Sequence, residues 1–147
     1  MRDQKLRAQI QSYYDYWNGL NGIYAAWARA HGIAVHTLFI LDVLYEEEEP
    51  CTLARICERL ALPKQTVHSV LEGLAKDGYI SRRPSQTDRR SKLLTLTPAG
   101  KAYAAPYLAA MYEWETRAFS RLSADERAAM TTLNARFLHS LCDEADV

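Results

Sequence analysis

The sequence predicts a mainly α-helical fold with one small β hairpin near its middle. Large apolar residues recur at steps of three and four along the first thirty residues, which is the period of a helix. Two short helical patterns separated by a tight turn follow Pro50, and a period-two alternation begins after Gly78. The chain has 147 residues, 48% of them apolar and 24% charged, which is typical of one ordinary globular domain.

The first predicted helix covers about residues 6–30 and carries a heptad-type apolar stripe. Seven large side chains, separated alternately by four and three positions, form this stripe: Leu6, Ile10, Tyr13, Trp17, Leu20, Tyr24 and Trp27. Gly32 is expected to end the helix. A stripe of this length needs a partner surface, either inside the chain or on a second copy.

The next segment, residues 34–45, is apolar around most of its surface, which predicts a buried central helix. Four adjacent carboxylates at positions 46–49 follow it. Their spacing does not place them around one metal ion, so we expect them to form a solvated helix end.

Two short helices are predicted next. Thr52 is expected to cap the first, which runs through Leu60, and Pro63 stands where the second begins. The second helix should end at Asp77 and Gly78. Two short helices joined by a tight turn form a helix-turn-helix pattern.

Strands are predicted at residues 79–83 and 91–97, joined by a long basic tip. Thr97 and Pro98 are typical of an N-cap and a first helical residue, and residues 123–126 form a capping box for the last helix. Five large apolar residues share one face of that last helix: Met130, Leu133, Phe137, Leu138 and Leu141.

Charge is unevenly distributed although the chain carries 18 basic and 18 acidic residues. The stretch from Thr52 to Lys101 holds ten basic and four acidic residues, a net charge of +6, whereas the flanks hold eight basic and fourteen acidic ones. A cationic centre between anionic ends favours a central module that contacts phosphate.

A helix-turn-helix followed by a hairpin is a winged helix, and the motifs here resemble the MarR family of bacterial transcriptional regulators. Residues 88–100 match the family's wing signature, D-x-R followed by L-T-x-x-G. Residues 74–80 are similar to the usual approach to the wing, and residues 62–67 to the start of the recognition helix in one subgroup. The turn at residues 60–62 departs from the family, where glycine is common.

The resemblance implies one domain, residues 1–147, that forms an obligate homodimer. About residues 34–97 would be the DNA-binding winged helix, and about residues 1–33 and 98–147 the dimerisation helices. Two winged helices would then meet a palindromic double-stranded DNA site. The family's wing-tip arginine enters the minor groove and an aspartate holds it, roles that would fall on Arg90 and Asp88.

The residue chemistry supports a DNA contact independently of the resemblance. The second short helix turns polar residues outward, and the wing carries four arginines. Gln can read adenine, and Lys can reach guanine or phosphate. Arg55 is expected to contact phosphate as well. The predicted DNA-binding residues are Lys64, Gln65, Thr66, His68, Ser69, Arg82, Arg83, Asp88, Arg89, Arg90 and Lys92.

A small aromatic effector is a further expectation, because MarR-like proteins often release DNA on binding phenolic acids. Aromatic side chains of the first two helices could line an apolar pocket with a few polar groups: Tyr13, Trp17, Tyr24, Trp27 and Phe39. The alternative is that these aromatic residues only form the core of a dimer.

No catalytic motif was found, so no enzymatic activity and no cofactor are expected. His139 and Cys142 supply only two ligands, which is too few for a zinc site. A redox switch at Cys51 or Cys142 is a minor alternative. No apolar run is long enough to span a membrane, so we expect a reduced, cytoplasmic protein. The main alternative function is a winged helix that binds another protein without specific DNA binding.

Overall fold

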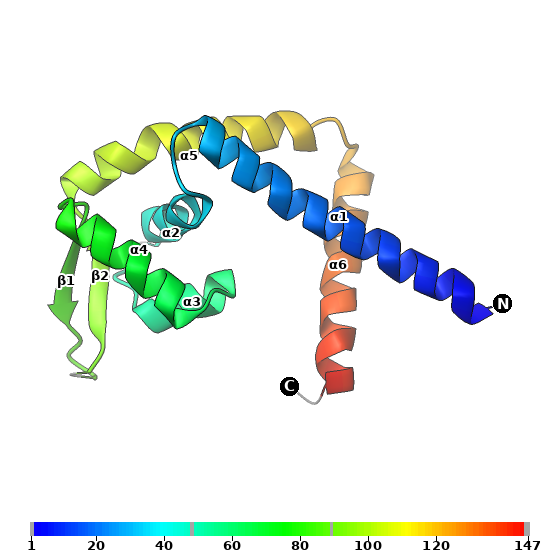
Figure 1. The fold of residues 1–147 in the computed structure, drawn as a ribbon, viewed down its shortest axis with the longest axis horizontal. Helices are drawn as coiled ribbons and strands as arrows, with labels where there is room; N and C mark the ends of the chain where they lie inside the picture. The colour runs from blue at the N-terminus through cyan, green and yellow to red at the C-terminus, as the bar shows by residue number, and fades with distance from the viewer. Residues whose placement is uncertain (1, 48, 89, 146–147) are drawn as a thin grey trace. The chain divides into compact units, whose positions relative to one another are not determined.

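The computed structural model describes residues 2–47, 49–88 and 90–145 (Figure 1). Six helices and two strands follow one another in the described chain: α1 (Arg2–Ala30), α2 (Val35–Glu46), α3 (Leu53–Leu60), α4 (Lys64–Lys76), β1 (Ile80–Pro84), β2 (Lys92–Leu96), α5 (Pro98–Phe119) and α6 (Ala124–Ala145). The predicted fold class, mainly helical with a two-stranded antiparallel wing, is therefore confirmed.

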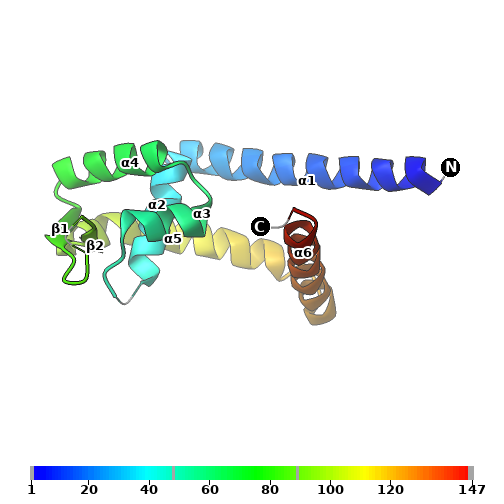
Figure 2. The same cartoon turned by 90° about the horizontal axis from the view of Figure 1, so that it is seen from below.

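The chain divides into two compact units, Met1–Leu108 and Ala109–Val147. In the first unit, α2 lies among α3, α4 and the hairpin, and it contacts α1 as well (Figure 1, Figure 2). The largest fully buried side chains all come from α2, α3 and α4: Leu38, Ile40, Leu41, Ile56, Val67 and Leu71. The prediction that α2 is a buried central helix is confirmed.

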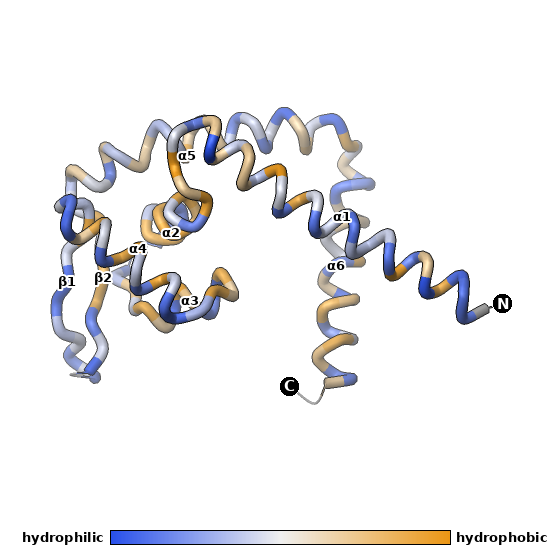
Figure 3. The backbone as a smooth tube through the Cα atoms, viewed as in Figure 1, coloured by the Kyte–Doolittle hydropathy of each residue, from blue (hydrophilic) through white to orange (hydrophobic). Residues whose placement is uncertain are grey.

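The apolar stripe of α1 is largely uncovered in the single chain. Trp17 is 48% exposed and Leu6 is 56% exposed, and orange apolar positions alternate with blue polar ones along this helix (Figure 3). In the second unit, α6 has no buried residue among those described, and its apolar face is likewise exposed. No described helix is both long and apolar enough to cross a lipid bilayer.

Three helices end on residues in the left-handed region of backbone space. Gly32 after α1 and Gly78 after α4 have φ of +76° and +78°, and the paired backbone hydrogen bonds around each form a Schellman motif. Ala61 after α3 has φ of +51°. Ala61 in the helix-turn-helix turn thus adopts the left-handed backbone conformation that glycine favours. This conformation destabilises the fold by roughly 1 kcal/mol for a residue with a side chain.

The hairpin pairs Ile80 with Leu96 at its base and Pro84 with Lys92 near its tip. The inner face of β2 buries Leu94 and Leu96. On its other edge β2 meets Cys51, whose backbone exchanges hydrogen bonds of 3.2 and 2.8 Å with Leu94. The segment before α3 is therefore tied to the wing.

Candidate nucleic-acid interface

The outer face of α4 is polar at its N-terminal end. Val67, Leu71 and Leu74 are buried and hold the other face of the helix against the core. Thr66 is half-buried, and the remaining predicted contact residues of this helix are exposed: Lys64, Gln65, His68 and Ser69. Pro63 precedes the first turn, where backbone N–H groups have no intrahelical partner. The start of α4 therefore combines amide donors with exposed polar side chains.

An ion pair joins α4 to the wing. Nη1 of Arg82, which lies opposite Leu94 in the hairpin, is 2.7 Å from Oε1 of Glu72 on α4. Nε2 of His68, one helical turn earlier, is 3.9 Å from the same oxygen. The next strand residue, Arg83, is exposed. Arg82 thus has a partner within the protein, which sequence reasoning had not identified.

Asp88 organises the turn at the wing tip. Its Oδ1 accepts a hydrogen bond of 2.9 Å from the backbone N–H of Arg90, and its Oδ2 accepts one of 3.1 Å from the hydroxyl of Ser91. The nearly buried hydroxyl of Ser85 accepts the backbone N–H of Asp88. Asp88 therefore holds Arg90 through the backbone of that residue. Arg89 lies outside the described residues.

A hollow of about 320 Å³ lies between α4, the wing and the start of α3. Five basic side chains from two separate motifs line it: Lys64, His68, Arg82, Arg90 and Lys92. Glu72 is the only carboxylate among its described lining residues. The other predicted contact residues of α4 and the wing lie outside this hollow: Gln65, Thr66, Ser69, Arg83 and Asp88.

The base of the wing is fastened to the end of α4. The Thr97 hydroxyl donates to the carbonyl oxygen of Gly78 at 2.7 Å and accepts the N–H of Gly100 at 3.0 Å. The N–H of Thr97 donates to the carbonyl oxygen of Tyr79 at 3.0 Å. A Cβ on Gly100 would overlap that oxygen and lie 2.8 Å from the carbonyl carbon. This close approach explains the glycine of the wing signature.

Tyrosine stacking reinforces the same junction. The rings of Tyr79 and Tyr103 are parallel within 8°, with centroids 4.3 Å apart, and Tyr107 packs edge-on against Tyr103 at 5.4 Å. Burial raises the pKa of the Tyr103 phenol, and Tyr107 raises it further. Tyr103 therefore remains neutral at physiological pH and packs as an uncharged ring.

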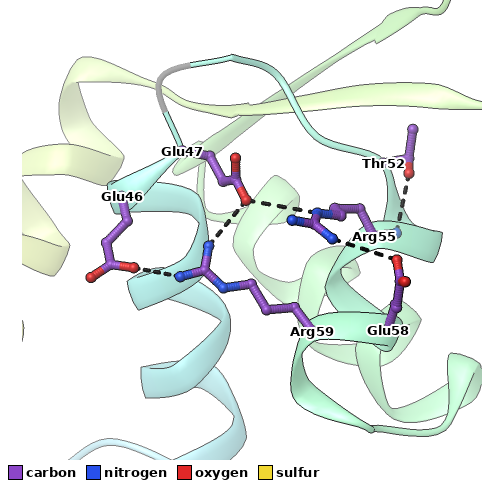
Figure 4. Close-up of polar contacts among 6 residues, drawn as sticks. All are labelled: Glu46, Glu47, Thr52, Arg55, Glu58 and Arg59. Carbon is purple, nitrogen blue, oxygen red and sulfur yellow. Dashed lines mark hydrogen bonds and ion pairs between the residues drawn. The ribbon is translucent and has the colours of Figure 1, made fainter.

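A second ion-pair cluster connects α2 to α3 (Figure 4). Arg59 contacts Glu46 at 2.6 Å and Glu47 at 3.0 Å. The hydrogen bond that the Arg59 guanidinium donates to Glu46 is the main cause that raises the pKa of Arg59 above its ordinary value. Arg55 lies 3.9 Å from Glu47 and 3.6 Å from Glu58. This cluster fixes the start of α3, where Thr52 accepts the backbone N–H of Arg55 at 3.2 Å.

The sequence had suggested only a solvated helix end for the acidic run. A usable signal was present: arginines at positions 55 and 59 share one face of the following helix. Arg55, expected to contact phosphate, lies within the ion-pair cluster. Glu48 lies outside the described residues.

Four of the five predicted effector-binding aromatic residues take part in ring contacts that the structure describes. Tyr24 and Phe39 come together, with ring centroids 5.6 Å apart. Trp27 stacks on His31 at 3.7 Å. Tyr13 lies 6.1 Å from Tyr16, and Trp17 is half-exposed on α1.

The cysteines do not form disulfides in this structure. Cys51 is buried, and burial raises the pKa of its thiol, which disfavours the reactive thiolate. Cys57 and Cys142 are half-buried. Within residues 2–47, 49–88 and 90–145, no three His, Cys, Asp or Glu side chains gather as a metal site.

Comparison with known proteins finds similarity to regulators of the MarR family. A sequence model of the MarR family matches residues 31–91. The HTH-type transcriptional regulator PapX of Escherichia coli is 27% identical over 115 residues, which cover 78% of this chain and 70% of PapX. Among solved structures, NMB1585, a MarR family regulator from Neisseria meningitidis, is 27% identical with a TM-score of 0.80, over 93% of this chain and 95% of NMB1585.

The MepR–DNA complex of S. aureus shares the fold as well. MepR is 22% identical with a TM-score of 0.76, and the match covers 87% of this chain and 97% of MepR. The family match spans α2, α3, α4 and β1 and ends just before β2, so it includes every residue that lines the hollow except Lys92 and Leu94.

The close approach at the wing base predicts a strong effect of Gly100→Ala. The added Cβ meets backbone atoms, which cannot move aside, so we expect a loss of about 3 kcal/mol in the free energy of unfolding. Urea denaturation at one fixed protein concentration measures this difference.

Gly73→Ala is the matched control, because a Cβ at this helical position meets no atom within 4 Å. It should stabilise the protein by roughly 0.5–1 kcal/mol. Equal effects of the two substitutions would contradict the steric explanation.

Proposed function

We propose that the chain is a transcriptional regulator of the MarR family, to whose members it is similar. It would be a ligand-responsive repressor that binds a palindromic operator as a homodimer. The observation that carries this proposal is the basic hollow, which gathers cations of α4 and the wing on one face of the first unit. Such a repressor would act in the cytoplasm, on the cell's own double-stranded DNA.

We assign different roles to the two parts of this face. The α4 residues Gln65, Thr66 and Ser69 would read base edges in the major groove, and Lys64 and His68 would contact bases or phosphate. Arg90, positioned by Asp88 through its backbone, would enter the minor groove. The remaining wing cations would hold phosphates: Arg83, Arg89 and Lys92, and Arg82 where it is not paired with Glu72.

The exposed apolar faces of α1 and α6 support the homodimer. Single exposed apolar residues are ordinary, but long apolar faces on two helices indicate a surface that another protein covers. We propose that the whole chain is one MarR-like domain, with residues 34–97 binding DNA and residues 1–33 and 98–147 forming the dimer. The buried area should exceed about 2,000 Å².

The alternative function is a winged helix that binds only another protein. Such a protein would not require basic residues at the wing tip. Here Arg90 and Lys92 are exposed and line the hollow together with Lys64. This grouping favours DNA as the partner.

Selection of random DNA with the purified protein tests operator binding directly. Two-fold symmetry of a dimer requires an inverted repeat with half-sites about one helical turn apart. Sedimentation equilibrium at micromolar concentration should show a dimer. Recovery of no enriched sequence, or a folded monomer, would overturn the respective part of the proposal.

Substitutions of Arg90 and Gln65 should separate affinity from sequence preference. Arg90→Ala should weaken binding to every sequence and reduce the slope of log K against log salt by about 0.9, since one phosphate-neutralising charge is lost. Gln65→Ala should relax preference at one position per half-site, at a cost of roughly 1–3 kcal/mol. Equal losses on all sequences for both variants would contradict these roles.

We propose that a small aromatic effector regulates this DNA binding. Binding between α1 and α2, near Tyr24 and Phe39, would change the separation of the two winged helices. A tenfold to hundredfold loss of DNA affinity requires only about 1.4–2.8 kcal/mol of coupling free energy.

Titration of aromatic acids into the protein–DNA complex tests this regulation. Quenching of tryptophan fluorescence should report binding, and a mobility shift should report DNA release at the same ligand concentrations. Phe39→Ala should reduce both responses. Quenching without any change in DNA affinity would exclude these residues as a regulatory site.

A further inference from the structure

We propose that Glu72 raises the DNA specificity of this protein by holding Arg82 against α4, which weakens the attraction of the basic hollow for phosphates. The inference rests on the proposed function, because it concerns DNA bound across that same face. Glu72 would make non-operator DNA bind more weakly than the cations of the face alone would allow.

The position of Glu72 within the hollow is the first observation. Its carboxylate lies on α4 among five basic side chains and is the only acidic group among the described residues that line the space. Its side chain is 52% exposed, so a phosphate that entered the hollow would meet it. A carboxylate on a phosphate-binding face offsets part of the attraction between the cations of that face and the DNA backbone.

The state of Arg82 is the second observation. Its guanidinium contacts Glu72 at 2.7 Å, and its side chain is only 26% exposed. Arg82 sits in β1 with its backbone paired to β2, so its reach is limited. While Glu72 holds it, Arg82 neutralises a carboxylate of the protein in place of a phosphate.

These two effects act unequally on different DNA sequences. On an operator, base contacts of α4 fix one register, and the phosphates occupy fixed positions relative to Glu72. On random DNA, binding rests on phosphate contacts alone, so the loss of one phosphate-binding cation to Glu72 weakens every register. Glu72 therefore lowers non-specific affinity more than specific affinity.

The decisive variant is Glu72→Gln, which keeps the shape of the side chain and removes its charge. Released Arg82 should gain about one phosphate contact on random DNA. Affinity for random duplex should then rise about eightfold at 0.1 M salt, with a salt slope steeper by about 0.9. Affinity for the selected operator should rise less than about threefold, so the specificity ratio should fall.

Glu113→Gln is the matched control. Glu113 also contacts an arginine, Arg117, at 2.6 Å, and both side chains are exposed. The control changes the net charge by the same amount on α5, at a residue that does not line the hollow. We expect it to leave the salt slope and the specificity ratio unchanged.

Arg82→Gln isolates the role of the ion pair. In this background, Glu72→Gln has no arginine to release, so it should not steepen the salt slope. A slope that steepens equally with and without Arg82 would overturn the release of this arginine.

The measurement separates this inference from the proposed function. Wild-type protein that binds selected and random DNA equally would refute operator recognition itself. Wild-type protein that discriminates between them, with a Glu72→Gln variant that discriminates equally well, would refute the role of Glu72 alone.

Discussion

The contact between the end of α4 and the first turn of α5 sets the geometry on which the candidate interface depends. One threonine, Thr97, binds the carbonyl groups of both Gly78 and Tyr79, and Gly100 permits the approach because it has no side chain. The hairpin begins and ends at this junction. The direction of the wing relative to α4 therefore follows from a backbone contact, which is stiffer than a contact between long side chains.

Two groups of basic side chains can be distinguished, those held in ion pairs within the protein and those exposed on the hollow. Arg59 is satisfied by the carboxylates at the end of α2, and Arg55 pairs with neighbouring glutamates, so neither is a free charge. Lys64, Arg90 and Lys92 are exposed on the hollow. A chain with zero formal net charge can thus present a basic face, because its acidic residues neutralise arginines elsewhere.

Local sequence patterns predicted most of the fold. Helical period and cap chemistry located every helix within a few residues, and the capping box is present, with reciprocal hydrogen bonds of 2.7 and 3.1 Å between Ser123 and Glu126. The Glu72–Arg82 pair and the α2–α3 cluster were not foreseen, because their partners belong to different elements and no local period connects them. The DNA contacts themselves remain predictions.

The hairpin has one consequence for the behaviour of the chain in solution. β2 is paired on both sides, by β1 and by the bridge to Cys51, whereas β1 has only β2 as a partner in the described sheet. An unpaired strand edge invites other chains to add to it, and charge and proline discourage such addition. β1 carries Arg82, Arg83 and Pro84 on that short edge. The wing residues suited to phosphate therefore also protect the protein from edge-to-edge aggregation.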